Sequence, residues 1–146
     1  MTRRYGSIVW VALLLMTGAV GCQPLPRPSG QGLVANPQSP LPDVPAPVTF
    51  RIVPSRSRTS VTPGGRVVDH LYQGLATTAA TVAYYRRVAA EHGWQPQREL
   101  THGGHVLMRY VSTRETLEIE VSRQGEVVSA QVRIRDTVAA PLPAKP

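Results

Sequence analysis

The chain has 146 residues, enough for one modest domain, and it is basic, with 16 Lys+Arg against 9 Asp+Glu. Its single cysteine excludes an internal disulfide. The arginines are scattered rather than clustered, which favours a bias in composition over a nucleic-acid-binding surface.

A secretory leader is predicted over residues 1–21. Arg3 and Arg4 form a short positive start, and the uncharged apolar run Ile8–Met16 follows. Small residues then lead to Cys22, which is the layout of a cleaved signal peptide. The apolar run is short for a transmembrane helix, which needs about 20 residues. Prolines directly after Cys22 prevent a helix from continuing.

The segment Ala19-Val20-Gly21-Cys22 resembles the lipobox of bacterial lipoproteins. The resemblance implies cleavage by signal peptidase II and acylation of Cys22, whose two or three chains would hold the protein firmly on a membrane. Gln23 after the cysteine implies the outer membrane, in an organism that has one. Two alternatives stay open: signal peptidase I could release an unmodified chain, or the leader could remain as an uncleaved anchor.

The next segment, residues 22–47, contains the lipidated cysteine and a spacer with more than half of the chain's 14 prolines. Proline removes backbone donors, so this stretch is predicted to be an extended, semi-stiff, disordered linker between membrane and domain. A similar Pro-rich composition predicts a disordered tail over residues 137–146.

The folded domain is predicted over residues 48–136. Strands are expected at Val48–Val53 and Arg66–Gln73, with a polar loop from residue 54 to 65 between them. The helix Thr78–His92 has apolar residues at helical spacing, a threonine cap at its start and Gly93 at its end.

An antiparallel meander should follow this helix, with a short strand at Arg98–Thr101 and three strands beyond it. Val106, Met108 and Tyr110 alternate with polar residues, and so do the apolar positions of segments 117–121 and 128–135. Placing Gln124-Gly125 in a tight turn pairs Val121 with Val128. The prediction is an α+β fold in which one helix packs on a mainly antiparallel sheet, in two layers.

The helix end, Tyr84–Trp94 (YYRRVAAEHGW), resembles a segment of small uncharacterised bacterial lipoproteins. These proteins share a preceding Val-Pro-x-Pro segment, here Val44–Pro47, and a strand that ends in glycine, here Tyr72–Gly74. The resemblance covers about residues 43–122. It implies a fold and an envelope location, and it implies no activity.

Residues typical of chemistry are few and poorly arranged. His102 and His105 are spaced as two metal ligands, which is too few for a site unless His70 or His92 joins them. Asp69 and His70 are neighbours on a strand, so they point to opposite faces and cannot act together with Ser57 or Ser60. The glycine turn Pro63–Arg66 precedes a strand and not a helix, which argues against a phosphate cradle. We therefore expect no catalytic residues, metal or cofactor.

The densest basic stretch contains Arg51, Arg56, Arg58 and Arg66, and it is the candidate anion-binding site. The chain is predicted to be a non-enzymatic lipoprotein of the cell envelope, anchored through Cys22, that binds an envelope protein and no nucleic acid. The alternative is a module that binds an anionic ligand, such as a cell-wall polymer or a lipid headgroup.

Overall fold

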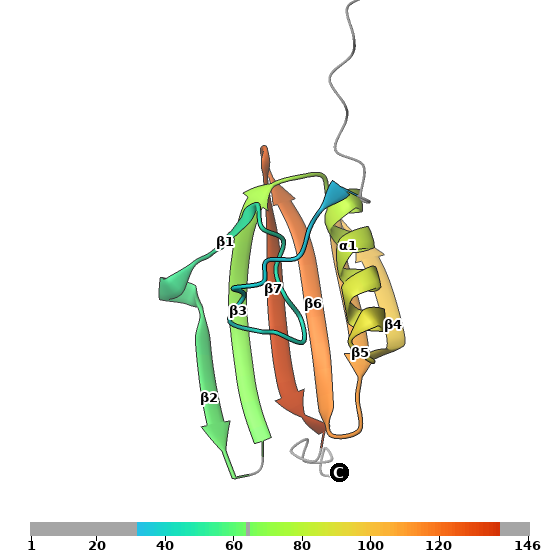
Figure 1. Ribbon diagram of the computed structural model, residues 1–146. Helices are drawn as coiled ribbons and strands as arrows, with labels where there is room; N and C mark the ends of the chain where they lie inside the picture. The colour runs from blue at the N-terminus through green and yellow to red at the C-terminus, as the bar shows by residue number, and fades with distance from the viewer. Residues whose placement is uncertain (1–31, 64, 138–146) are drawn as a thin grey trace, which may run out of the picture.

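The computed structural model describes residues 32–63 and 65–137, which form seven strands, one α-helix and a short 3₁₀-helix, η2 (Figure 1). In chain order the elements are β1 (Phe50–Ile52), η2 (Pro54–Arg56), β2 (Arg58–Thr62), β3 (Gly65–Leu75), α1 (Thr78–Glu91), β4 (Gln95–His102), β5 (His105–Val111), β6 (Glu115–Gln124) and β7 (Val127–Asp136).

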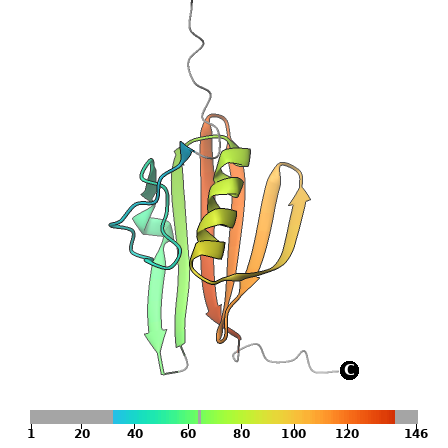
Figure 2. The same ribbon diagram turned by 45° about the vertical axis from the view of Figure 1, so that its right-hand side comes forward.

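All seven strands form one antiparallel sheet in the order β1-β3-β7-β6-β5-β4, and β2 also pairs with β3. β1 and β2 lie end to end along the same side of β3, because β1 pairs with residues 72–74 and β2 with residues 65–69. α1 packs on one face of this sheet (Figures 1 and 2). The predicted α+β architecture of one helix on a mainly antiparallel sheet is therefore confirmed.

The helix forms where its sequence signals place it. Thr77 caps the start, since its side chain accepts a hydrogen bond from the Ala80 amide at 3.0 Å. Gly93 ends it with a positive φ of 80°, a conformation that glycine adopts without steric cost. Trp94 follows and is buried in the core, as are Tyr84, Tyr85 and Val88 of the helix. The predicted helix is confirmed to within one residue.

The cross-strand pairs of the two hairpins can be compared with the pairs predicted from the sequence. Tyr110 pairs with Leu117 and Met108 with Ile119, as predicted. Val121 was expected to pair with Val128 but pairs with Ala130, because the turn is Gly125-Glu126 instead of Gln124-Gly125. Gly125 has a φ of 61°, which this turn position requires. The shift changes each partner by two residues, so the same side chains still face the core.

The predicted polar loop from residue 54 to 65 is wrong, because this stretch contains η2 and the edge strand β2. β2 has a neighbour on one side only and all five of its residues are exposed. An exposed edge strand needs no apolar face, so its sequence lacks the alternation that reveals a buried strand. Its Thr59 and Val61 are β-branched, which suits a strand.

The predicted end of the linker at residue 47 is also wrong. Residues 33–47, here called the cover loop, bury Leu33, Leu41, Val44 and Ala46 in the same core as α1. The ends of the loop meet, since Ala35 bridges to Pro47 and the Asn36 amide donates to the Ala46 carbonyl at 2.9 Å. This is an Ω-loop, whose prolines leave few backbone donors to satisfy. The domain therefore begins well before residue 48.

The cover loop is needed because one helix is too narrow for this sheet. A helix with its side chains is about 10–12 Å wide, whereas neighbouring strands lie about 4.8 Å apart. The loop lies beside α1 on the β3 side of the sheet (Figures 1 and 2). Tyr84 of α1 donates a hydrogen bond to the buried Pro45 carbonyl at 2.8 Å, which fastens the loop to the helix.

The predicted signal peptide, Cys22 and the first part of the linker lie outside the described residues, and so do residues 138–146 of the predicted tail. Among the residues that the structure describes, α1 is the only α-helix, and it is too short and too polar to cross a bilayer.

Candidate functional site

The four arginines of the predicted anion-binding stretch do not form one site. Paired residues on neighbouring strands share a face of the sheet. Arg51 pairs with Gln73 and Arg58 with Asp69, which places both arginines on the face opposite α1, here called the open face. Arg66 lies on the α1 face instead, and Arg56 is exposed on η2. The predicted patch is thus split between the two faces.

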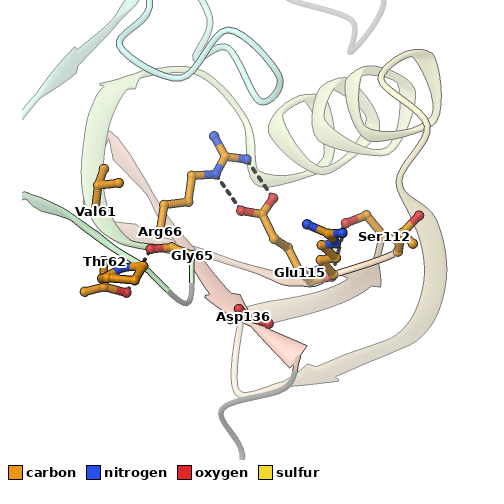
Figure 3. A pocket seen from close by; sticks show the side chains of 10 residues that line it. Val61, Thr62, Gly65, Arg66, Ser112, Glu115 and Asp136 are labelled. Carbon is orange, nitrogen blue, oxygen red and sulfur yellow. Dashed lines mark hydrogen bonds and ion pairs between the residues drawn. The ribbon is translucent and has the colours of Figure 1, made fainter.

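Arg66 is held by two carboxylates. Its Nε and Nη2 donate to Glu115 at 2.8 and 2.9 Å (Figure 3), and its Nη1 donates to Asp43 of the cover loop at 3.2 Å. The hydrogen bonds to Asp43 and then to Glu115 raise the pKa of Arg66 above its ordinary value. Because two carboxylates already compensate this cation, Arg66 fastens the cover loop to β3 and β6 and is not available to an external anion.

A pocket of about 540 Å³ lies beside this cluster, between the β2–β3 turn and the β5–β6 turn. Arg66 and Glu115 form part of its wall, with Val61 and Thr62 on one side and Ser112 on the other (Figure 3). The Thr62 hydroxyl donates to the Gly65 carbonyl at 3.0 Å across the glycine turn. The predicted turn is therefore a β-hairpin turn, and the pocket walls carry charges of both signs.

The Asp69-His70 pair is separated as the strand periodicity predicted. His70 is buried on the α1 face, where it hydrogen-bonds the Thr59 hydroxyl at 2.7 Å and the Tyr72 hydroxyl at 3.0 Å. Burial lowers the pKa of His70. Asp69 lies on the open face, and Ser57 accepts a hydrogen bond from the Leu71 amide at 3.0 Å. These groups do not meet at one point.

His102 and His105 do lie side by side, because they pair across the turn between β4 and β5. His105 Nδ1 is 3.2 Å from Glu120 Oε1 on β6. Among residues 32–63 and 65–137, no group of three or more His, Cys, Asp or Glu is close enough to hold a metal ion.

The open face carries a row of charges that sequence reasoning found only in part. One residue from each of six neighbouring strands contributes, and each is paired with the next: Arg58, Asp69, Arg133, Glu118, Arg109 and Arg98. At about 4.8 Å per strand the row crosses roughly 24 Å of sheet. The charges alternate in sign from Arg58 to Arg109, and Arg109 is followed by a second cation, Arg98.

The three carboxylates of this face all have cationic partners. Arg109 lies 3.5 Å from Glu118, and Arg133 lies 3.7 Å from both Asp69 and Glu120. Such exposed pairs contribute about 0–1 kcal/mol each to stability. Among the described residues, four other arginines of the face have no ion pair: Arg51, Arg58, Arg98 and Arg135. The open face is therefore a wide surface with an excess of positive charge, and its exposed side chains include Val67, Leu75, Leu100 and Val127.

The two-residue turn Gly103-Gly104 was the signal that could have placed Arg98 and Leu100 on this face, because it sets them opposite Arg109 and Leu107. No protein family, no curated protein and no solved structure matches this chain.

Proposed function

We propose that this protein is an envelope lipoprotein, anchored to a membrane through Cys22, whose α+β domain binds an envelope protein and performs no catalysis. The leader and the lipobox resemblance of the sequence support the anchor. The structure separates the candidate catalytic groups, since Asp69 and His70 face opposite sides of the sheet. Arg66 in the pocket wall is compensated by Glu115 and Asp43.

The observation that carries the binding role is the open face. Within the described residues, α1 and the cover loop lie on one face of the sheet, and no second layer covers the other. A single-layer face of this width offers a broad docking surface whose polar residues stay solvated until a partner arrives. Its unpaired arginines favour a partner with complementary negative charge.

A second candidate is a module for an anionic ligand, such as a cell-wall polymer or a lipid headgroup. The observation that favours it is that Arg51 and Arg58 lie on the same open face, on consecutive strands beside β3 and opposite Gln73 and Asp69. Binding that depends on these arginines would weaken steeply as salt is added, because exposed charges are screened beyond about 8 Å at physiological salt.

The first experiment is an intact-mass spectrum of the protein from native membranes, with Cys22→Ala as the matched control. The proposal expects an N-terminus at Cys22 with the added mass of a diacylglyceryl group, and a control that carries no lipid and leaves the membrane fraction. An unmodified wild-type chain in the soluble fraction would contradict the anchor.

The binding role is tested by purifying the wild-type protein in detergent and identifying proteins that co-purify in stoichiometric amount. Charge reversal of Arg51 and Arg58 together separates the two candidates. Loss of binding to purified cell-wall polymer or anionic vesicles, with no protein recovered from either form, would favour the second candidate.

A further inference from the structure

On the open face of the β4–β5 hairpin, each cross-strand pair consists of two residues of the same type. Directly opposed residues are two arginines, then two leucines, then two histidines: Arg98 with Arg109, Leu100 with Leu107, and His102 with His105. All six share the face opposite α1, because their neighbours Val106, Met108 and Tyr110 point into the core.

The arginine pair is unfavourable by itself, since like charges directly opposite on paired strands repel each other. Arg109 is relieved by Glu118 at 3.5 Å. Arg98 has no such carboxylate among the described residues, because Glu99 points to the other face and binds Arg86 at 3.0 Å. The Arg98 guanidinium is therefore available to an anion from outside the domain.

A pair of apolar side chains lies directly beside this cation. Leu100 is 43 % exposed and Leu107 is half-buried next to it. α1 packs on the opposite face and cannot cover them. A ligand that satisfies Arg98 would therefore also bury Leu100 if it carried an apolar group next to its anionic group.

β4 is also an edge of the sheet, with no described strand on its outer side (Figure 2). Pro96 and the register shift between Pro96 and Arg98 interrupt the first part of the strand, which protects it from pairing. The part from Arg98 to His102 is regular, so its outer backbone groups are open to an extended segment.

We propose that the Arg98–His102 part of β4, with the open face of the hairpin, binds an extended acidic segment of a partner protein. In this segment a carboxylate contacts Arg98 and the next side chain on the same face, two residues along, is apolar and covers Leu100. This inference rests on the proposed function, and it names the site and the partner chemistry.

An anionic membrane fits the same cation less well. Glu118 and Glu120 lie on the next strand, β6, close beside the hairpin face. A uniformly negative lipid surface would meet these carboxylates, which Arg109 and Arg133 already compensate, and would gain little from them. A discrete carboxylate on a peptide can instead contact Arg98 alone.

The experiment places a photo-crosslinking amino acid at Leu100 of the full chain, in the membranes of the organism's own cells. The matched control carries it at Val127, which is also exposed on the open face but three strands away on β7, opposite Leu75. Each is combined with Arg98→Glu or with Arg135→Glu, which reverses another unpaired arginine of this face.

The inference expects a protein adduct at Leu100, mapped by mass spectrometry to an acidic segment. Its yield should fall about tenfold with Arg98→Glu and little with Arg135→Glu. Recovery of the adduct when the mapped acidic residue is changed to lysine in the Arg98→Glu background would establish the contact.

Three results would overturn the inference. They are adducts of lipid alone at Leu100, protein adducts that ignore Arg98→Glu, and protein adducts at Val127 with none at Leu100. The last result would leave the binding role intact and move its site. Protein adducts at neither position, together with no co-purifying protein, would instead contradict the proposed function itself.

Discussion

Two neighbouring tyrosines of α1 allow a controlled test of how the cover loop is held. Tyr84 and Tyr85 are both fully buried, and their rings contact each other edge to face with centroids 5.1 Å apart. The Tyr84 hydroxyl donates to the Pro45 carbonyl at 2.8 Å, whereas the Tyr85 hydroxyl has no hydrogen-bond partner among the described residues. Changing each to phenylalanine removes the same atom from two different environments.

The two changes should alter stability in opposite directions. Tyr84→Phe leaves the buried Pro45 carbonyl without its donor, which costs about 1–3 kcal/mol. Tyr85→Phe removes a buried hydroxyl that makes no bond, so the free energy of unfolding should rise by about 1 kcal/mol. Both changes keep the ring, so core packing is preserved.

Urea unfolding of the two variants and the wild type, followed by circular dichroism, measures this difference. The m-value should stay constant, since neither change alters the surface exposed on unfolding. Equal destabilisation by Tyr84→Phe and Tyr85→Phe would refute the reasoning, because it would mean that the hydrogen bond to the cover loop does not distinguish the two hydroxyls.

Three further predictions test the same architecture. Leu41→Ala should lower the free energy of unfolding by about 2–5 kcal/mol if the cover loop belongs to the core, and a loss under 0.5 kcal/mol, roughly a surface value, would contradict this. Arg66→Met should lower the free energy of unfolding by about 1–3 kcal/mol, because it leaves two carboxylates without their cation, and urea unfolding would measure the loss. Burial raises the pKa of Tyr72 and Tyr84 to about 12. The unfolded chain ionises these tyrosines near pH 10, so the free energy of unfolding should fall between about pH 10 and 12. Each tyrosine should contribute a loss of about 1.4 kcal/mol per pH unit, and Tyr84→Phe should remove the contribution of Tyr84.

Local signals explain what could be predicted about the fold. Thr77 and Gly93 mark the ends of α1, and the two-residue alternation of β5, β6 and β7 identifies their buried faces. The pairing of Tyr110 with Leu117 followed from that alternation. The β6–β7 register did not, because shifting the turn by one residue leaves the same apolar face inward, so periodicity cannot separate the two registers.

The candidate surface was predicted less well than the fold. Arg51, Arg58 and Arg66 are close in sequence, yet the pleat of β1, β2 and β3 sends Arg66 to the other face. Arg98 stands at the end of the charged row because six strands pair in one register. Among these pairings β3–β7 joins distant parts of the chain, and no local pattern of the sequence reveals it.

The sequence by itself determined the α+β class, the helix, the meander strands and their buried faces, because capping, turn residues and periodicity are properties of neighbouring residues. Only the tertiary structure decided that the proline-rich cover loop is part of the core. One helix leaves part of a seven-stranded sheet bare, and the apolar Leu41 and Val44 bury themselves there despite the prolines around them. The tertiary structure likewise decided that Arg66 serves the fold, since its partners Asp43 and Glu115 meet it only when the loop and two strands come together.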